Sequence, residues 1–594
     1  MLGKGEEGET WLRAVQRFLD VGNDFAVHGL SCLLIVFVCF LLLGGTLRGG
    51  FPRDFRDATL AFYVAKVMML LDGFGFYTPS WYFGYEILRY YPPLSTFLPF
   101  LVAKMSGALM FSYYFLCFVF YTVSCIGVYF FVQKFVESKM AGLFVGVVWP
   151  IVHVNFVSFQ GHYWEIARLF GAAVIPWAMY FVEGAIEEDG RERIVAFVLL
   201  VSCAALSSML SVLDLVLTLL VFTVLRGIVV PPVPRQLRGV VRRRTLSVLG
   251  MGGLGVLGLC LWWYVPALLP HGVGAFISGY DGKPWNLPEV FLQVSPPNWM
   301  PAVQLPITVL GLMGAVTALY RQERKGMMLV TLCFLSLLTA YLIRVQPMRL
   351  VFDTGFTLIL LIGYFARNLL DLVKNSFDHV THLKNRHSEV HNLIIPLILP
   401  ALICMYLPAY ADSATVDDSY RFSDEFVTAT WLKENVDSGF RVYVMYGELY
   451  RGSQWLNAFY PQVKQVLGGF DQGARIKGNA PFVFDDMVKQ GSDPAEVYDL
   501  ASTYHVKYIV VDRVWMQGIS PQAYQKFSDS SFFRPVGSIN RELSYAEVFE
   551  VLGISPLDEM STEYEYWDSW RVIGVMSSML FLILFIRSVM RYEP

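Results

Sequence analysis

Long apolar runs recur through most of this 594-residue chain and constrain its fold more than any other feature. A helix needs about 20 apolar residues to cross the roughly 30 Å hydrocarbon core of a bilayer. With 55% hydrophobic and only 16% charged residues, the composition is typical of an α-helical polytopic membrane protein. We expect twelve spans, at residues 27–47, 113–134, 140–157, 169–186, 194–209, 211–226, 246–269, 304–320, 326–343, 350–366, 393–410 and 570–587.

Clusters of basic residues orient these spans, because cytoplasmic loops carry an excess of lysine and arginine. The segment 226–244 holds six arginines and is therefore expected in the cytoplasm. Counting from it places 411–568 outside, and Phe51–Leu94 also outside if the apolar stretch 95–110 does not cross. We therefore assign 95–110 to the outer loop and divide 194–226 at Ser207–Ser208. If 194–226 were one long helix, every loop before residue 194 would be predicted on the opposite side of the membrane.

The stretch Phe51–Leu94 follows the first span and is too polar and too often interrupted by Pro and Gly to cross a membrane. It is rich in aromatic residues and carries acids at Asp54, Asp57, Asp72 and Glu86. Two interpretations stay open. The stretch is an ordinary loop whose aromatics lie in the interfacial belt, or it is a structured loop that holds a site for chemistry at the membrane surface.

Residues 411–568 differ in composition from the rest, because charged and amide residues rise and the apolar runs shorten. Short apolar runs alternating with amphipathic segments predict a small α/β domain, tethered to the membrane at both ends. The expected strands are Arg441–Tyr446, Lys507–Val511 and Ala546–Val551, and the expected helices are Ser423–Asn435, Phe484–Gln490 and Pro494–Tyr504.

A second short outer loop carries His162 and Glu165. If the outer loops converge, Asp54 or Asp57 can face these two residues. Such a cluster would hold a divalent cation, Mg²⁺ or Mn²⁺, or serve as a general base. The alternative is an ordinary salt bridge between Glu165 and Arg168 at i,i+3.

Arg344 and Arg349 flank an outer turn, where basic residues oppose the usual charge bias. One explanation is recognition of a lipid phosphate, for which the guanidinium fork is well shaped. The other is an i,i+4 pair between Arg349 and Asp353. Both explanations stay open.

Several classes of site are not expected. The formal net charge of −3 does not favour nucleic acid as a partner. All eight cysteines lie in apolar runs without metal-ligand spacing, so neither disulfides nor a zinc site are expected.

The motif Tyr90-Tyr91-Pro92-Pro93-Leu94, preceded by Trp81 and Gly84, resembles the GT-C superfamily of membrane glycosyltransferases. It is particularly similar to the prokaryotic branch called 6-pyruvoyl-tetrahydropterin-synthase-related membrane proteins, in which an acid and a helix come before these residues. Asp57 matches that acid best, and Asp54 is second. The loop Gly161–Glu165 and the stretches Trp431-Leu432, Val466–Gly469 and Tyr508–Asp512 extend the resemblance.

This resemblance implies an inverting glycosyltransferase that moves a sugar from a polyprenyl-phosphate donor to a glycan, lipid or protein acceptor. The reaction would take place on the extracytoplasmic face of the plasma membrane. His162 stands where a metal-binding member often has an acid, so a requirement for metal is left open. The implied roles are Asp57 or Asp54 as base, Glu165 and His162 for acceptor or cation (with Asp57 as a possible metal ligand), Arg349 and Arg344 for phosphate, and Trp81, Tyr82, Tyr90 and Tyr91 as substrate-lining aromatics.

Two other classes remain as alternatives: a lipid or glycan flippase or transporter, and a non-catalytic scaffold whose outer domain binds a partner. A transporter predicts mid-membrane charges and internal repeats. The expected organisation is an amphipathic N-terminal helix (1–26), a GT-C-like transmembrane domain (27–410) with outer loop 48–112, an extracytoplasmic α/β domain (411–568), and a final transmembrane helix with a cytoplasmic tail (569–594).

Overall fold

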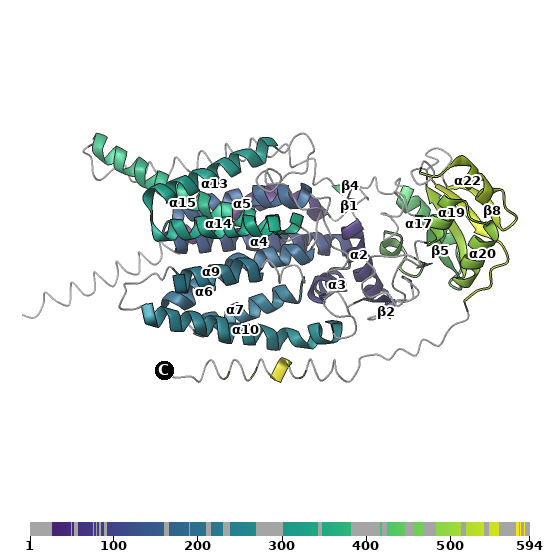
Figure 1. The fold of residues 1–594 in the computed structure, drawn as a ribbon, viewed down its shortest axis with the longest axis horizontal. Helices are drawn as coiled ribbons and strands as arrows, with labels where there is room; N and C mark the ends of the chain where they lie inside the picture. Colours follow the sequence, from purple (N-terminus) through teal and green to yellow (C-terminus); the bar gives the residue numbers. More distant parts are fainter. Residues whose placement is uncertain are drawn as a thin grey trace, which may run out of the picture.

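In the computed structural model, a helical bundle lies at one end of the molecule and a smaller α/β body at the other (Figure 1). Short elements of the stretch Phe51–Leu94, called the first loop below, lie between them. The residues described are 26–48, 50–52, 58–74, 77–78, 80–81, 85–87, 92–159, 166–188, 191–208, 215–229, 238–268, 301–342, 347–381, 416–417, 424–445, 455–466, 483–512, 518–539, 546–557, 576, 578–580, 583 and 587.

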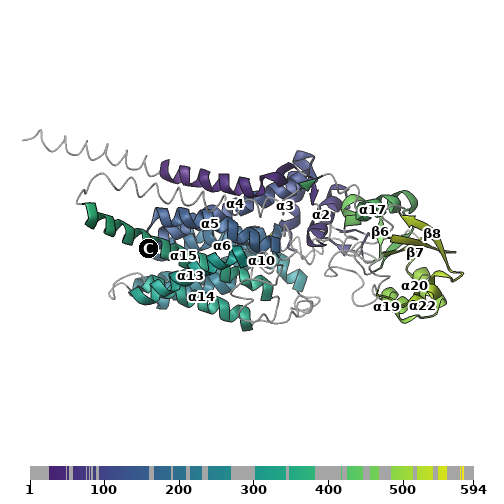
Figure 2. The same ribbon diagram turned by 90° about the horizontal axis from the view of Figure 1, so that it is seen from above.

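The bundle consists of long apolar helices that run side by side (Figures 1 and 2). Five described helices are long and apolar enough to cross a membrane: Ala26–Arg48, Leu109–Val136, Leu169–Glu188, Arg238–Tyr264 and Gly355–Leu372. A mostly helical chain with several helices of spanning length is thus confirmed, whereas the count of twelve spans stays a prediction. The labelled helices of the bundle are α4 (Leu109–Val136), α5 (Lys139–Phe159), α6 (Ile166–Glu188), α7 (Arg191–Ala205), α9 (Val221–Val224), α10 (Arg238–Leu268), α13 (Pro301–Arg321), α14 (Arg324–Leu342) and α15 (Pro347–Thr381), with π-helical turns η2 (Leu215–Leu220) and η3 (Leu225–Val229) on either side of α9.

Small residues let the helices of the bundle approach closely. A Cβ on Gly142 of α5 would lie 2.8 Å from the carbonyl oxygen of Tyr129 in α4, and one on Gly127 would lie 2.7 Å from the ring of Trp177 in α6. Contacts of this kind are typical of helix packing in membranes, where van der Waals packing replaces the hydrophobic effect between helices.

The segment 194–226 passes along the bundle twice. Helix α7 starts directly after α6 and ends at Ala205. The Ser207 hydroxyl then donates to the carbonyl of Ala167, at the beginning of α6. Arg226 pairs with Glu183, near the end of α6. The chain therefore runs the length of α6, turns and comes back, which confirms the expected break at Ser207–Ser208.

The first loop contains β1 (Phe51–Pro52), α2 (Ala58–Leu71), β2 (Tyr77–Thr78) and β3 (Tyr85–Glu86), and α3 (Leu94–Ser106) follows it. Strands β2 and β3 form an antiparallel hairpin. Helix α3 has 13 residues, so it is only about 20 Å long and too short for a bilayer crossing. The Leu94 amide donates to the carbonyl of Leu206, just after α7. We call this end of the bundle the loop end.

The α/β body (described residues within 424–557) is built on a five-stranded sheet with the strand order β6-β5-β7-β9-β8. Strand β5 is parallel to β6 and β7, and β9 is antiparallel to β7 and β8. Asp493 and Ser520 accept backbone N–H bonds as N-caps of α20 and α22, each with Pro at the first helical position. The elements are α17 (Asp424–Asn435), β5 (Arg441–Val444), β6 (Lys464–Gln465), α19 (Val483–Gln490), α20 (Pro494–Thr503), β7 (Val506–Asp512), α22 (Pro521–Ser528), β8 (Phe533–Ile539) and β9 (Ala546–Val551).

Candidate functional site

The two candidate catalytic acids lie in the sequence between two described elements, strand β1 and helix α2. Asp54 and Asp57 belong to residues 53–57, which are outside the described residues. Before the segment, β1 pairs antiparallel with β4 (Val416–Asp417), a two-residue strand that comes just before the α/β body. After it, α2 begins at Ala58. The described neighbours of this segment, β1 and α2, therefore lie at the junction of the bundle, the first loop and the chain that leads into the α/β body.

Helix α2 is an almost completely buried element. Its residues Leu60–Ala65 are at most 4% exposed, and the ring of Phe62 stacks on Trp81 with centroids 5.7 Å apart and an interplanar angle of 12°. Burial on all sides explains why this stretch of the first loop is so apolar. It also gives the segment 53–57 a rigid support on its C-terminal side.

Lys66 of α2 is a candidate functional residue that the sequence reasoning missed. Its side chain is fully buried, and its Nζ lies 4.7 Å from the ring centroid of Phe62 and 5.8 Å from that of Tyr63. Burial lowers the pKa of the Lys66 ammonium well below its usual value. A fully buried lysine is rare in proteins, and the available signal was a single ammonium in the middle of an apolar run.

Among the four candidate aromatics, Trp81 is described, whereas Tyr82, Tyr90 and Tyr91 lie outside the described residues. Trp81 is fully buried, and its indole N–H donates to the side-chain carbonyl of Asn457 in the α/β body at 2.7 Å. Trp81 therefore joins the first loop to the α/β body.

The remaining predicted residues are at the loop end or outside the described residues. His162 and Glu165 belong to 160–165, between the end of α5 and the start of α6, and Arg344 belongs to 343–346; neither segment is described. Arg349 lies in the first turn of α15, where only its backbone is described.

The register of two helices places Arg349 at the same end as the second loop. The rings of Trp149 in α5 and Phe356 in α15 touch at 5.7 Å between centroids, and the two helices run in opposite directions. Arg349 lies seven residues before Phe356, or about 10 Å closer to the loop end. Seven residues after Trp149, α5 reaches residue 156, about one turn before the segment 160–165 that contains His162 and Glu165. Arg349 and this segment therefore belong to the same end of the bundle.

No group of three or more His, Cys, Asp or Glu side chains that could hold a metal ion occurs among the described residues. The three proposed ligands Asp57, Glu165 and His162 all fall outside that part of the chain. The divalent cation therefore stays a prediction.

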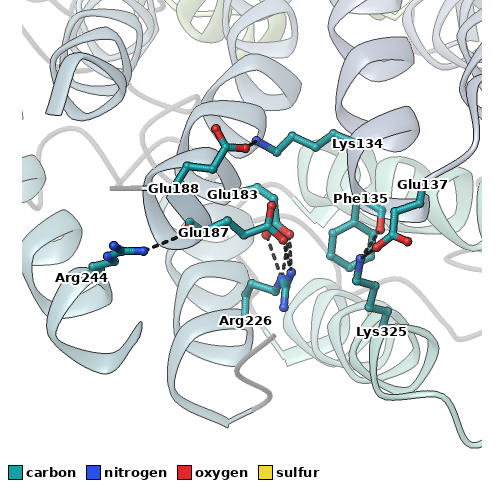
Figure 3. A network of polar contacts seen from close by, with 9 residues as sticks. All are labelled: Lys134, Phe135, Glu137, Glu183, Glu187, Glu188, Arg226, Arg244 and Lys325. Atoms are coloured by element: carbon teal, nitrogen blue, oxygen red, sulfur yellow. Dashed lines mark hydrogen bonds and ion pairs between the residues drawn. The ribbon is translucent and has the colours of Figure 1, made fainter. Parts of the chain in front are cut away.

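A network of ion pairs occupies the opposite end of the bundle, which we call the charged end (Figure 3). Arg226, 1% exposed, donates to both oxygens of the buried Glu183 at 2.5–2.9 Å and to Glu187 at 2.9 Å. Around it, Lys134 pairs with Glu188 at 3.2 Å. Lys325 of α14 also pairs with Glu137 at 2.7 Å. Three helices and η3 are joined here by matched charges, so we interpret this network as structural.

The helical bundle, the first loop at its loop end and the α/β body together define a membrane protein with the GT-C fold. The fold is shared with the apo oligosaccharyltransferase of Archaeoglobus fulgidus (TM-score 0.54, 13% identity, 86% of this chain and 73% of that chain). It is also shared with apo ArnT from Cupriavidus metallidurans (TM-score 0.55, 12% identity, 89% and 98%).

Residues 88–343 match the family model described as 6-pyruvoyl-tetrahydropterin synthase related domain, membrane protein. The family resemblance expected from the motifs in the first and second loops is thus confirmed. A search of curated proteins finds no match to the sequence.

Proposed function

We propose that this protein is an inverting glycosyltransferase that moves a sugar from a polyprenyl-phosphate donor to an acceptor hydroxyl at the loop end of the bundle. One observation carries the proposal: in a GT-C fold, the two elements that flank the acid-bearing segment 53–57 in sequence are β1, which pairs with β4, and the buried helix α2. The site would face the extracytoplasmic side of the plasma membrane, where the α/β body would also lie.

Two proteins of the same fold support a lipid-phosphate ligand. ArnT from C. metallidurans has been solved bound to undecaprenyl phosphate (TM-score 0.51, 12% identity). The oligosaccharyltransferase AglB from A. fulgidus has been solved with an inhibitory peptide and a dolichol-phosphate (TM-score 0.54, 13% identity). For this chain, the acceptor classes that we propose are a glycan, a lipid or a protein.

The proposed chemistry needs one base and several positive charges. Asp57, or Asp54 in its place, takes the proton of the acceptor hydroxyl as its oxygen attacks the anomeric carbon. The bond between that carbon and the phosphate oxygen breaks, and its electron pair leaves with the polyprenyl phosphate. Arg349 and Arg344 stabilise the negative charge of the departing phosphate.

Other residues would position the substrates. Glu165 and His162 would orient the acceptor. With Asp57, Glu165 would supply two carboxylates, the oxygen ligands that Mg²⁺ or Mn²⁺ prefers, and His162 would add an imidazole beside them. Such a cation would supply further positive charge for the leaving phosphate. Tyr82, Tyr90 and Tyr91 would stack on the sugar or line the lipid groove.

The test is sugar release by the full-length protein in lipid nanodiscs, supplied with radiolabelled polyprenyl-phosphate sugars. Asp57→Asn should lower turnover by about 10²-fold or more, with donor binding unchanged. Asp72→Asn is the matched control, because Asp72 is an exposed acid at the end of α2 in the same loop. If Asp57→Asn is active and Asp54→Asn is not, the role moves to Asp54. Full activity in both variants excludes a first-loop acid from the mechanism.

The two alternatives make different predictions for the same preparation. A flippase would move a labelled lipid across the nanodisc or vesicle without releasing sugar, and a scaffold would do neither. The buried charges described at Glu183 and Arg226 neutralise each other at one end of the bundle, so they do not favour a transport pathway at the membrane midplane.

A further inference from the structure

The α/β body and the first loop are joined by a buried set of polar contacts centred on Asn457. We infer that the α/β body is a clamp that fixes helix α2 of the first loop, and that Asn457 is a positioning residue that acts through α2. The catalytic part of this inference rests on the proposed function, whereas the clamp itself does not.

Asn457 is fully buried and uses both ends of its side-chain amide. Its Oδ1 accepts the indole N–H of Trp81 at 2.7 Å and a second hydrogen bond from the Gln465 side chain. Its Nδ2 donates to the carbonyl of Val463 at 2.8 Å. Because Oδ1 faces the first loop and Nδ2 faces its own domain, the amide can bridge the two parts in one orientation only.

The backbone of the first loop also covers one edge of the sheet. Strand β6 is the edge strand next to β5. The amide of Gln465 in β6 donates to the carbonyl of Ser80 at 2.9 Å, and the Ser80 hydroxyl donates to the carbonyl of Pro461 at 2.5 Å. An exposed edge would offer unpaired N–H and C=O groups to other chains. Here the Ser80 carbonyl satisfies the N–H of Gln465, and the neighbouring Trp81 bonds Asn457, so Ser80 and Trp81 dock together.

A second tether lies on the other side of the acids. The pairs Phe51↔Asp417 and Pro52↔Val416 join the start of the first loop to the chain that leads into the α/β body. The segment 53–57 is therefore bounded on one side by a strand pair. On the other side it is bounded by α2, whose Phe62 stacks on Trp81.

The contacts form a continuous path from Asn457 to the buried helix α2. Asn457 holds the indole of Trp81, the indole holds the ring of Phe62, and the Lys66 ammonium lies over that same ring. All four side chains are at most 1% exposed. We expect a displacement of the indole to reach α2, because protein interiors are close-packed and transmit strain.

Two variants test the clamp. Asn457→Ala removes the whole bridge, and Trp81→Phe keeps an aromatic ring against Phe62 while removing the N–H that Asn457 accepts. Asn435→Ala is the matched control, because Asn435 is an exposed asparagine of the same body that bonds only within α17, to the carbonyl of Trp431.

The first measurement is hydrogen–deuterium exchange of peptides from α2 in the full-length protein. We expect exchange in α2 to rise about tenfold or more in Asn457→Ala and by less in Trp81→Phe, with no change in Asn435→Ala. Unchanged exchange in α2 of folded variants would overturn the clamp. This measurement does not depend on enzymatic activity.

The second measurement is turnover and donor binding on the same preparations. A misplaced base lowers kcat by about 10- to 100-fold, while the affinity for undecaprenyl phosphate should change less than about twofold. The double variant should be no slower than Asn457→Ala alone, since both changes break one bridge. Normal kcat in variants with loosened α2 would refute the positioning role. No sugar release by the wild-type protein would refute the proposed function and leave the exchange result to decide the clamp.

Discussion

Removing Arg226 should destabilise the bundle strongly, because its guanidinium is what makes the buried carboxylate of Glu183 tolerable. Glu183 is fully buried and accepts three contacts of 2.5–2.9 Å from Arg226. In Arg226→Met the carboxylate of Glu183 keeps its desolvation penalty and loses its partner. Breaking a buried ion pair in this way costs about 3–5 kcal/mol.

The double variant Glu183→Gln/Arg226→Met removes both charges and should recover a large part of that loss. Arg193→Met is the matched control, because Arg193 pairs with Glu188 on a partly exposed surface, where an ion pair contributes only about 0–1 kcal/mol.

The assay is thermal and denaturant unfolding of the purified variants in one detergent, followed by tryptophan fluorescence. Arg226→Met should unfold at a clearly lower temperature and denaturant concentration than the wild type and Arg193→Met. The double variant should unfold between Arg226→Met and the wild type. If Arg226→Met is no less stable than Arg193→Met, the charged end does not hold the helices together. The ion pairs drawn in Figure 3 would then have no structural role.

Three further outcomes are expected. A cysteine at Gly473, in a background without the native cysteines, should react with an impermeant thiol reagent in intact cells; labelling only after lysis would reverse the predicted sides. Arg349→Ala should weaken polyprenyl-phosphate binding by about tenfold to a hundredfold, as for a lost charge-assisted pair of 1.5–3 kcal/mol, and Arg349→Lys should recover part of it; unchanged binding with a lower melting temperature would assign Arg349 a structural role. The hydrogen bond from Lys325 lowers the pKa of Glu137, so this pair stabilises the fold above the ordinary glutamate pKa of about 4.3, and its contribution is lost as the pH falls through the lower pKa of the folded state. In Lys325→Met, the free energy of unfolding should therefore fall less over that pH range than in the wild type. The same pH dependence in both proteins would argue against the pair.

Local sequence patterns predicted most of the secondary structure of the α/β body. The expected strand Arg441–Tyr446 is observed as Arg441–Val444, and Lys507–Val511 as Val506–Asp512. Strand β8 was missed because Pro535 and Gly537 interrupt its apolar pattern. The structure shows the reason: β8 is an edge strand with an irregular register between these two residues, and an edge tolerates a proline that a central strand does not.

The path of the chain through the bundle needed tertiary contacts. Apolar length alone left open whether 194–226 is one helix or two. The contacts of Ser207 and Arg226 with opposite ends of α6 decide that the chain turns back. Length likewise singled out 95–110 as ambiguous, and α3 is now seen to be too short to cross.

By itself, the sequence determined the features that depend on neighbouring residues: the apolar helices, the strands and the acid-rich first loop with its family motifs. These follow from local propensity, hydrophobic periodicity and charge. Only the tertiary structure decided which distant residues meet. Trp81 and Asn457 are 376 positions apart, and Glu183 and Arg226 are 43 apart. Each partner looks ordinary in its own stretch, because a buried hydrogen bond or ion pair is a property of two surfaces brought together by folding.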